Sequence, residues 1–237
     1  MKSSIKIVSI AFLLFGCTAQ QIQSITDAIG YEEGLTSEQV ASGLKEALIQ
    51  GISTGTQKVG KVDGYFKNPS IKIPFPPDVQ KVENTLRDIG LGSQVDRFVK
   101  TLNRGAEEAA KEAKPVFVSA IRQMTINDAW TILKGDNKEA ATDYLKRTTS
   151  DELRSRFGPI VKRALEETNA TKYYSEIITR YNKIPLVETV NPDLETYAIE
   201  KAMEGLFFMV AKEEKNIRAN PASRTTDLLK RVFKEQD

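Results

Sequence analysis

Hydrophobic residues recur at every third or fourth position through most of the chain, which is the period of an amphipathic helix. The first stripe follows Thr36 and contains Val40, Leu44, Leu48 and Ile52. Thr36 and Gln39 have the spacing of a capping box, so we expect this helix to begin there. Similar stripes, separated by Gly and Pro, predict further helices over residues 78–89, 93–113, 117–124, 126–134, 140–145, 150–165, 173–184, 193–219 and 226–233.

Several of these helices have recognisable start signals. Thr125 with Asp128 has the spacing of an N-cap, and Thr149 with Glu152 has that of a second capping box. Residues 191–193, Asn-Pro-Asp, favour a helix start because Asn caps, Pro fits the first turn and the acid lies near the positive end of the helix dipole. Within the following helix, residues 206–210 are apolar on every side, which predicts the most deeply buried helix of the fold.

Residues 63–77 interrupt the helical pattern. Two short apolar runs lie on either side of Asn68-Pro69, a turn signal, and several prolines follow that exclude a helix. This pattern predicts a short β-hairpin or an extended Pro-rich arm. The arm either covers an open edge of the core or binds a partner, and in the second interpretation Ile71, Ile73 and Pro74 would form a rigid apolar contact surface.

The first 17 residues indicate membrane targeting. Lys2 and Lys6 form a basic start, and the apolar run from Ile5 to Phe15 is shorter than the roughly 20 residues needed to span a bilayer. The run ends in Leu14-Phe15-Gly16-Cys17, which resembles a bacterial lipobox. The resemblance implies cleavage before Cys17 and attachment of acyl chains such as palmitate to its sulfur and amine, which together make a durable anchor. The alternative is a plain secretory signal that happens to end in a cysteine.

These patterns divide the chain into three parts. We predict a lipoprotein signal peptide over residues 1–16, a lipidated Cys17 with a flexible polar tether over 17–35, and a single all-α, multi-helix domain over 36–235. The domain would carry the hairpin or extended arm described above.

Composition excludes several kinds of chemistry. The chain has 237 residues, no His and one Cys, so Ser-His and Cys-His pairs and His-ligated metal sites cannot form. We therefore predict no catalytic residue, no metal and no cofactor. Once the leader with its two lysines is set aside, 32 basic side chains equal 32 acidic ones, which gives no global attraction to nucleic acid.

Two polar clusters are candidate binding sites. In each, residues four apart in sequence share one face of a predicted helix. The first, with its Asn-Glu pair, could bind a metal, a sugar or a partner, and the second could use two carboxylates as acid and base. Either could instead be a solvated helix face with a surface ion pair of little energetic value. The first cluster contains Asn103, Arg104 and Glu107, and the second contains Glu213, Glu214 and Arg218.

Six segments along the domain carry a family resemblance, in this order: GLKEAL, NPSIKIPFP, RDIGLGSQVDRFVKTLNRGAEEAA, AKPVFVSAIRQMTINDAW, AATDYLKRTTSDEL and KAMEGLFFMVAKEEKNIRANPASRTTDLLKRVF. From Thr36 to Phe233 they resemble an uncharacterised bacterial envelope family, domain of unknown function four-one-nine-seven. Order and spacing both match, although Gly105 stands where a second alanine is expected. The resemblance implies a helical lipoprotein on the periplasmic side and no mechanism.

The sequence thus predicts a non-catalytic lipoprotein of the bacterial cell envelope with a binding or structural role. It would be held to a membrane by its N-terminal lipid, face the periplasm, and contact an envelope protein, a lipid or a cell-wall component. Thr18 is not the aspartate that retains some lipoproteins at the inner membrane, which favours the outer membrane. The alternative is a periplasmic hydrolase that uses two carboxylates as acid and base.

Overall fold

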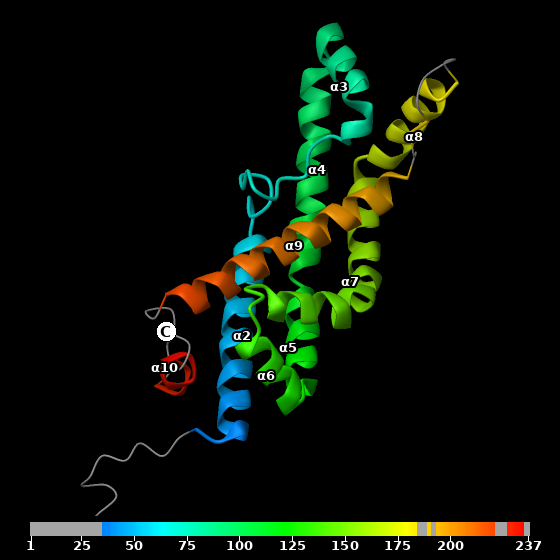
Figure 1. The fold of residues 1–237 in the computed structure, drawn as a ribbon. Coiled ribbons are helices and arrows are strands. Elements are labelled where there is room, and N and C mark those ends of the chain that lie inside the picture. Colours follow the sequence, from blue (N-terminus) through cyan, green and yellow to red (C-terminus); the bar gives the residue numbers. More distant parts are fainter. Residues whose placement is uncertain (1–34, 184–188, 191–192, 221–226, 235–237) are drawn as a thin grey trace, which may run out of the picture. The chain divides into compact units, whose positions relative to one another are not determined.

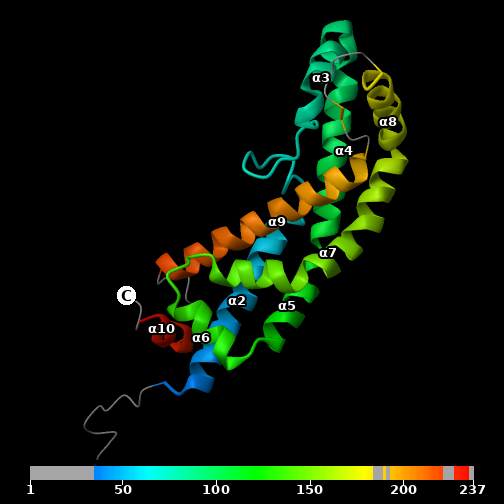
Figure 2. The ribbon, with the colours of Figure 1, turned by 45° about the vertical axis from the view of Figure 1, so that its right-hand side comes forward.

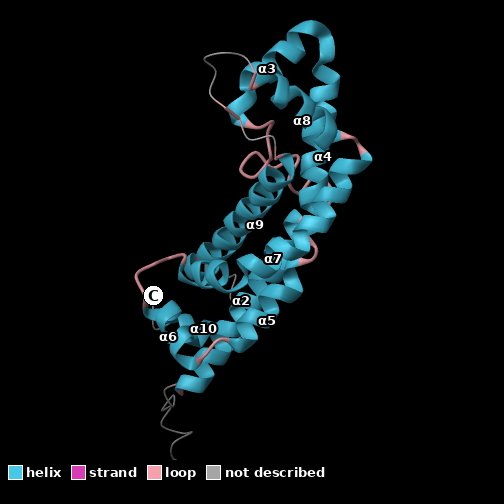
Figure 3. Cartoon of the chain, turned by 90° about the vertical axis from the view of Figure 1, so that its right-hand side faces the viewer, coloured by secondary structure: helices cyan, strands magenta, loops and turns pink. Residues whose placement is uncertain are grey.

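The computed structural model describes residues 35–183, 189–190, 193–220 and 227–234. These residues fold as helices joined by turns and contain no strand (Figures 1 and 3). The all-α class is therefore confirmed, whereas the predicted signal peptide, Cys17 and nearly all of the tether lie outside the described residues. The helices are α2 (Ser37–Val59), α3 (Gln80–Leu86), α4 (Gly92–Ala110), α5 (Ala113–Gln123), α6 (Ile126–Lys134), α7 (Ala140–Glu167), α8 (Ala170–Tyr181), α9 (Leu194–Ala219) and α10 (Asp227–Lys234), with a 3-10 turn at Pro77–Val79 and a π turn at Arg87–Leu91.

Helix α9 is the element against which much of the fold packs. It contacts α2, α4, α7 and α8, and Figures 1 and 2 show it lying across α2 and α4. Phe207 on its buried side meets Phe117 of α5 edge to face, with ring centroids 5.7 Å apart. Gly51 of α2 lies directly against α9, since an added Cβ there would be 2.9 Å from Cδ1 of Ile217. The predicted buried helix is thus at the centre of the core.

The prediction that residues 206–210 are buried on every side is wrong at one position. Phe208 is 48% exposed, whereas Phe207 beside it is only 4% exposed. Successive residues on a helix point in directions about 100° apart, so a helix with neighbours on several sides can still leave one residue on its outer face. Phe208 is that residue.

The start signals were reliable in two places and misleading in a third. A capping box is present at Thr36, as predicted, and Thr125 is the predicted N-cap of α6, where Asp128 completes a capping box. Thr149 does not begin a helix, because α7 continues through it and through Pro159. Its hydroxyl donates to the carbonyl of Leu145 at 2.6 Å, a bond that Thr makes readily inside a helix. At the start of α9 the cap is Asp193, and Asn191 and Pro192 lie outside the described residues.

Residues 60–76, called the connecting segment below, join α2 to the 3-10 turn. They form turns followed by an irregular run, so the predicted β-hairpin is wrong. Ile71, Ile73 and Phe75 of this segment are buried. Phe75 lies 5.1 Å from the ring of Phe98 on α4, which in turn stacks 6.1 Å from Tyr174 on α8. The connecting segment therefore covers the core rather than leaving it.

No helix within the described ranges is long and apolar enough to cross a membrane.

Candidate functional site: two buried polar clusters and a surface groove

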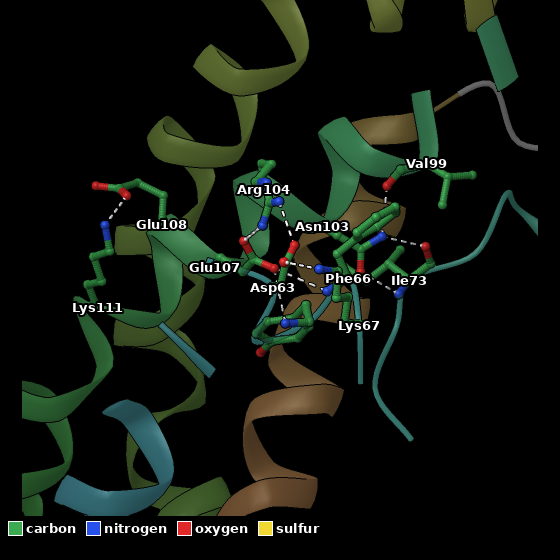
Figure 4. A network of polar contacts seen from close by, with 11 residues as sticks. Asp63, Phe66, Lys67, Ile73, Val99, Asn103, Arg104, Glu107, Glu108 and Lys111 are labelled. Atoms are coloured by element: carbon green, nitrogen blue, oxygen red, sulfur yellow. Dashed lines mark hydrogen bonds and ion pairs between the residues drawn. The ribbon is translucent and has the colours of Figure 1, made fainter. Parts of the chain in front are cut away.

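Asn103 binds the backbone of the connecting segment. Its Oδ1 accepts from the N–H of Ile73 at 2.9 Å, and its Nδ2 donates to the carbonyl of the same residue at 2.8 Å (Figure 4). Nδ2 also donates to the carbonyl of Val99 at 2.7 Å. The side chain is fully buried. One amide thus replaces a strand partner for Ile73 and satisfies backbone groups that would otherwise be buried without a hydrogen bond.

Glu107, one turn further along α4, binds an earlier part of the same segment. Its Oε1 accepts from the N–H groups of Tyr65 and Phe66, each at 3.1 Å, and its Oε2 accepts from Arg104 (Figure 4). Glu107 is buried. A buried carboxylate requires this number of donors to balance its loss of hydration. Asn103 and Glu107 therefore attach two points of the connecting segment to α4.

Arg104 extends this cluster to the surface. Its Nη2 donates to Oδ1 of Asp63 at 2.6 Å, and Lys67 reaches the other oxygen of Asp63 at 2.8 Å. These hydrogen bonds, first from Lys67 and then from Arg104, lower the pKa of Asp63 below its ordinary value. Asp63 has a positive φ of 68°, a conformation that Asp tolerates better than most residues. The ion pairs thus stabilise the turn that follows α2.

Tyr65 links the connecting segment to α9. Its ring is fully buried, and its hydroxyl donates to the carbonyl of Ala202 at 2.6 Å. Burial, and then the nearby charge of Glu107, raise the pKa of this phenol. The ring fits against α9 because residue 205 is Gly, where an added Cβ would lie 2.6 Å from Cε1 of Tyr65.

Glu214 caps helix α7 from α9. Its two oxygens accept from the N–H groups of Ala141 and Thr142 at 3.0 and 2.9 Å, and from the Thr142 hydroxyl at 2.8 Å. Those N–H groups belong to the first turn of α7, which has no intrahelical acceptor and carries the positive end of the helix dipole. Arg218 completes the arrangement by donating to Glu214 and to the carbonyl of Ile132.

Glu213 points to a different neighbour. Its Oε1 lies 2.6 Å from Nζ of Lys58 on α2, and its carboxylate is largely buried. The predicted clusters are therefore neither solvated helix edges nor open ligand sites. Asn103, Glu107 and Glu214 bind backbone groups of neighbouring segments, and Glu213 joins two packed helices.

The described surface is hollowed along α9 instead. A groove of about 810 Å³ runs between α7 and α9, and a second hollow of about 350 Å³ lies between α9 and the connecting segment. Phe208 and Glu204 line both, so the two hollows flank one stripe of α9. Ile71, Ile73 and Pro74, the predicted contact residues of the arm, line the smaller hollow, where the two isoleucines are 7% and 1% exposed. They form its wall and not a projecting apolar edge.

The larger groove combines an apolar floor with a charged rim. Met203, Phe207, Phe208 and Ala211 provide the apolar surface. The charged residues are Glu139, Lys146 and Arg154 from the α7 side and Glu200, Glu204, Lys212 and Lys215 from α9. Sequence reasoning missed this groove because it assigned Phe208 to the core. Within the described ranges, no group of three or more His, Cys, Asp or Glu side chains could hold a metal ion.

The fold and the buried clusters define an all-α protein in which side chains of two helices bind the backbone of neighbouring segments. The sequence profile of a family described as "Protein of unknown function (DUF4197)" matches residues 34–234, so the chain belongs to that family. This confirms the resemblance drawn from the sequence. No curated protein matches the chain, and no solved structure does.

Proposed function

We propose that this protein is a non-catalytic, lipid-anchored protein of the bacterial cell envelope that acts by binding a partner along the outer face of α9. The observation that carries the proposal is Phe208. It is a large aromatic ring, about half exposed, between two hollows. Aromatic residues surrounded by charged rims are typical centres of protein interfaces.

The buried carboxylates support binding over hydrolysis. A general acid or base must reach the bond that it cleaves, with a second carboxylate at a set distance from it. Glu107 and Glu214 already accept several hydrogen bonds from backbone N–H groups and arginines. Their arrangement is explained by the segments that they fix in place, and no observation on the described residues favours the hydrolase alternative.

The anchor is supported by the sequence. Leu14-Phe15-Gly16-Cys17 after a short apolar run resembles a lipobox, and acyl chains on Cys17 would hold the domain at a membrane facing the periplasm. Thr18 favours the outer membrane. Cys17→Ser is expected to release the protein into the soluble periplasmic fraction or leave it uncleaved, as judged by fractionation and apparent mass. Normal processing with unchanged membrane association would contradict the anchor.

The binding role is tested in cells with a measurable deletion phenotype. Phe208→Asp is expected to abolish complementation, because it places a charge at the centre of the proposed interface while the core residues beneath it stay in place. Tyr173→Asp is the matched control, since Tyr173 is also an exposed aromatic, at 58%, but lies on α8 outside both hollows. It should complement normally. Circular dichroism of both variants should match the wild type.

Two outcomes would contradict the proposal. One is full complementation by Phe208→Asp. The other is a loss of function in Glu213→Gln with an unchanged fold, because Glu213 lies away from both hollows and a carboxylate-dependent reaction would then be the better explanation.

A further inference from the structure

The exposed stripe of α9 has opposite charges on the two sides of an aromatic centre. Glu204 lies one turn before Phe208, and Lys212 lies one turn after it. Glu200 extends the acidic half and Lys215 the basic half, and all five residues line the same groove. On the α7 side of this groove, Lys146 and Arg154 add positive charge and Glu139 adds negative charge.

We propose that this stripe binds the same stripe of a second copy of the chain, with the two α9 helices antiparallel and a two-fold axis at Phe208. The proposal rests on the binding role above and names its partner. In a two-fold interface, residues at equal distances from the axis face each other. Glu204 of each copy would therefore face Lys212 of the other, and the two Phe208 rings would meet at the centre.

Charge complementarity selects this arrangement. A parallel pair of stripes would place Glu204 against Glu204 and Lys212 against Lys212, whereas the antiparallel pair forms two attractive contacts. Among the described residues, Lys212 has no ion-pair partner of its own, so its charge is available to a second copy. Glu204 pairs with Lys201 through Oε2 at 2.6 Å, which leaves its other oxygen to accept.

One kind of like-charge contact, which the two-fold axis repeats, has to be accommodated. Lys201 and Lys215 lie two turns from Phe208 on opposite sides, so they would face each other in the antiparallel pair. Each is already paired with an acid of its own chain, Lys201 with Glu204 and Lys215 with Glu139, both at 2.6 Å. These partners reduce the repulsion. The hollows of about 810 and 350 Å³ beside Phe208 give the opposing ring space to enter.

Cysteine crosslinking in intact envelopes tests the arrangement on the full-length chain. Two residues can form a disulfide only when their Cα atoms are within about 7 Å, which residue 208 satisfies near a two-fold axis. Phe208→Cys is expected to give a covalent dimer on mild oxidation that reducing agent reverses. Ile89→Cys, at a position 65% exposed in the π turn, and the unaltered chain should give none.

A second pair of variants leaves Phe208 intact. Glu204→Cys and Lys212→Cys chains, expressed together, should crosslink to each other more efficiently than either does to itself. This result is specific to the antiparallel register, because a parallel pair would instead favour self-crosslinking. Because these chains keep Phe208, an absent crosslink could not be blamed on the loss of the aromatic ring.

Charge reversal is the sharpest test of whether Glu204 of one copy faces Lys212 of the other. Glu204→Lys alone and Lys212→Glu alone should each lower the dimer yield by about five-fold or more, because each creates two like-charge contacts. Chains carrying one reversal, mixed with chains carrying the other, should recover the yield, since an all-basic stripe then faces an all-acidic one. The yield is measured with tagged chains crosslinked through Phe208→Cys.

Failure of the mixed chains to recover the yield would overturn the proposed register. If Phe208→Cys crosslinks only to a different protein, the second-copy proposal is wrong and the binding role of α9 stands. If Phe208→Cys gives no crosslink and Phe208→Asp retains full function, both proposals are wrong.

Discussion

Two regions of the molecule use polar and apolar residues in opposite ways. One is the junction where the connecting segment packs on α4, and the other is the outer stripe of α9. At the junction, Asn103 and Glu107 are buried and bind backbone N–H and C=O groups of residues 65–73. On α9, Phe208 is exposed among charged side chains. Polar groups are expected outside and aromatic rings inside, so each region departs from that expectation. The departures have different causes.

At the junction, the buried polar residues allow an irregular segment to pack on the core. A segment without regular secondary structure can lie on a core only if its backbone hydrogen bonds are satisfied, and α4 supplies the partners. The backbone of α9 pairs within its own helix, and Phe208, at 48% exposed, gives the folded chain less stabilisation from burial than a core ring would. The buried polar residues are explained by the architecture, whereas the exposed Phe208 is not, which is why the proposed binding role rests on it.

The largest expected effect comes from a substitution that disrupts the junction between the connecting segment and α4. Ile73→Asp is expected to prevent folding, because it puts a carboxylate where the side chain is 1% exposed and no cation is provided. Lys72→Asp is the control, since Lys72 is exposed next to it and only places its ammonium over the Phe66 ring. Thermal melting should show a cooperative transition for the control and none for Ile73→Asp. A folded Ile73→Asp would show that the connecting segment is dispensable to the core.

A smaller effect on stability is expected from removing either of two adjacent aromatic rings on α9. Phe207→Ala is expected to lower the free energy of unfolding by roughly 3–5 kcal/mol, the usual loss for a buried ring. Phe208→Ala should cost only about 1 to 1.5 kcal/mol, roughly half of the value for a fully buried side chain, since 48% of its surface is already in water. Urea denaturation of both variants measures the difference. Equal losses would mean that Phe208 is covered in solution, as it would be in a persistent dimer that unfolds with the chain.

The sequence predicted the architecture well because local signals dominate it. Stripes with helical spacing, the capping box at Thr36 and the N-cap at Thr125 located helices correctly. The capping box predicted at Thr149 failed because a Thr can bond to the carbonyl four residues before it as readily as it can cap. The connecting segment could be recognised as non-helical from its prolines. Its burial could not, because the partners that bind it lie about 30 to 40 residues further along the chain.

The candidate sites were harder to predict than the fold, although the sequence carried some signals of them. Asn103 follows Val99 by four residues, so it lies on the apolar stripe of α4, which indicates a buried amide and not a surface one. Glu204 and Lys212 lie one turn on each side of Phe208, and charged neighbours on the same face indicate that this face of α9 is exposed. The capping of α7 by Glu214 had no sequence signal, because it joins residues more than 70 positions apart.

The smallest expected effect concerns the edge of the junction and its dependence on pH. Hydrogen bonds from Lys67 and Arg104 lower the pKa of Asp63 in the folded chain below its ordinary value of 3.8. The unfolded chain therefore binds more protons between these two pKa values, and stability rises with pH across that interval. The contribution of Asp63 is fully present above its ordinary pKa and is lost as the pH falls through its folded pKa.

Asp63→Asn isolates this contribution, because Asn also tolerates the positive φ of 68° at this position but carries no charge. The urea midpoint of Asp63→Asn should lie slightly below that of the wild type at neutral pH, and the two should converge on acidification below about pH 4. High salt should also reduce the difference, since Asp63 is partly exposed to solvent and its ion pairs are screened. A difference that persists unchanged in acid would arise from the shape of the turn, and the ion pairs of Asp63 would then contribute nothing to holding the connecting segment on α4.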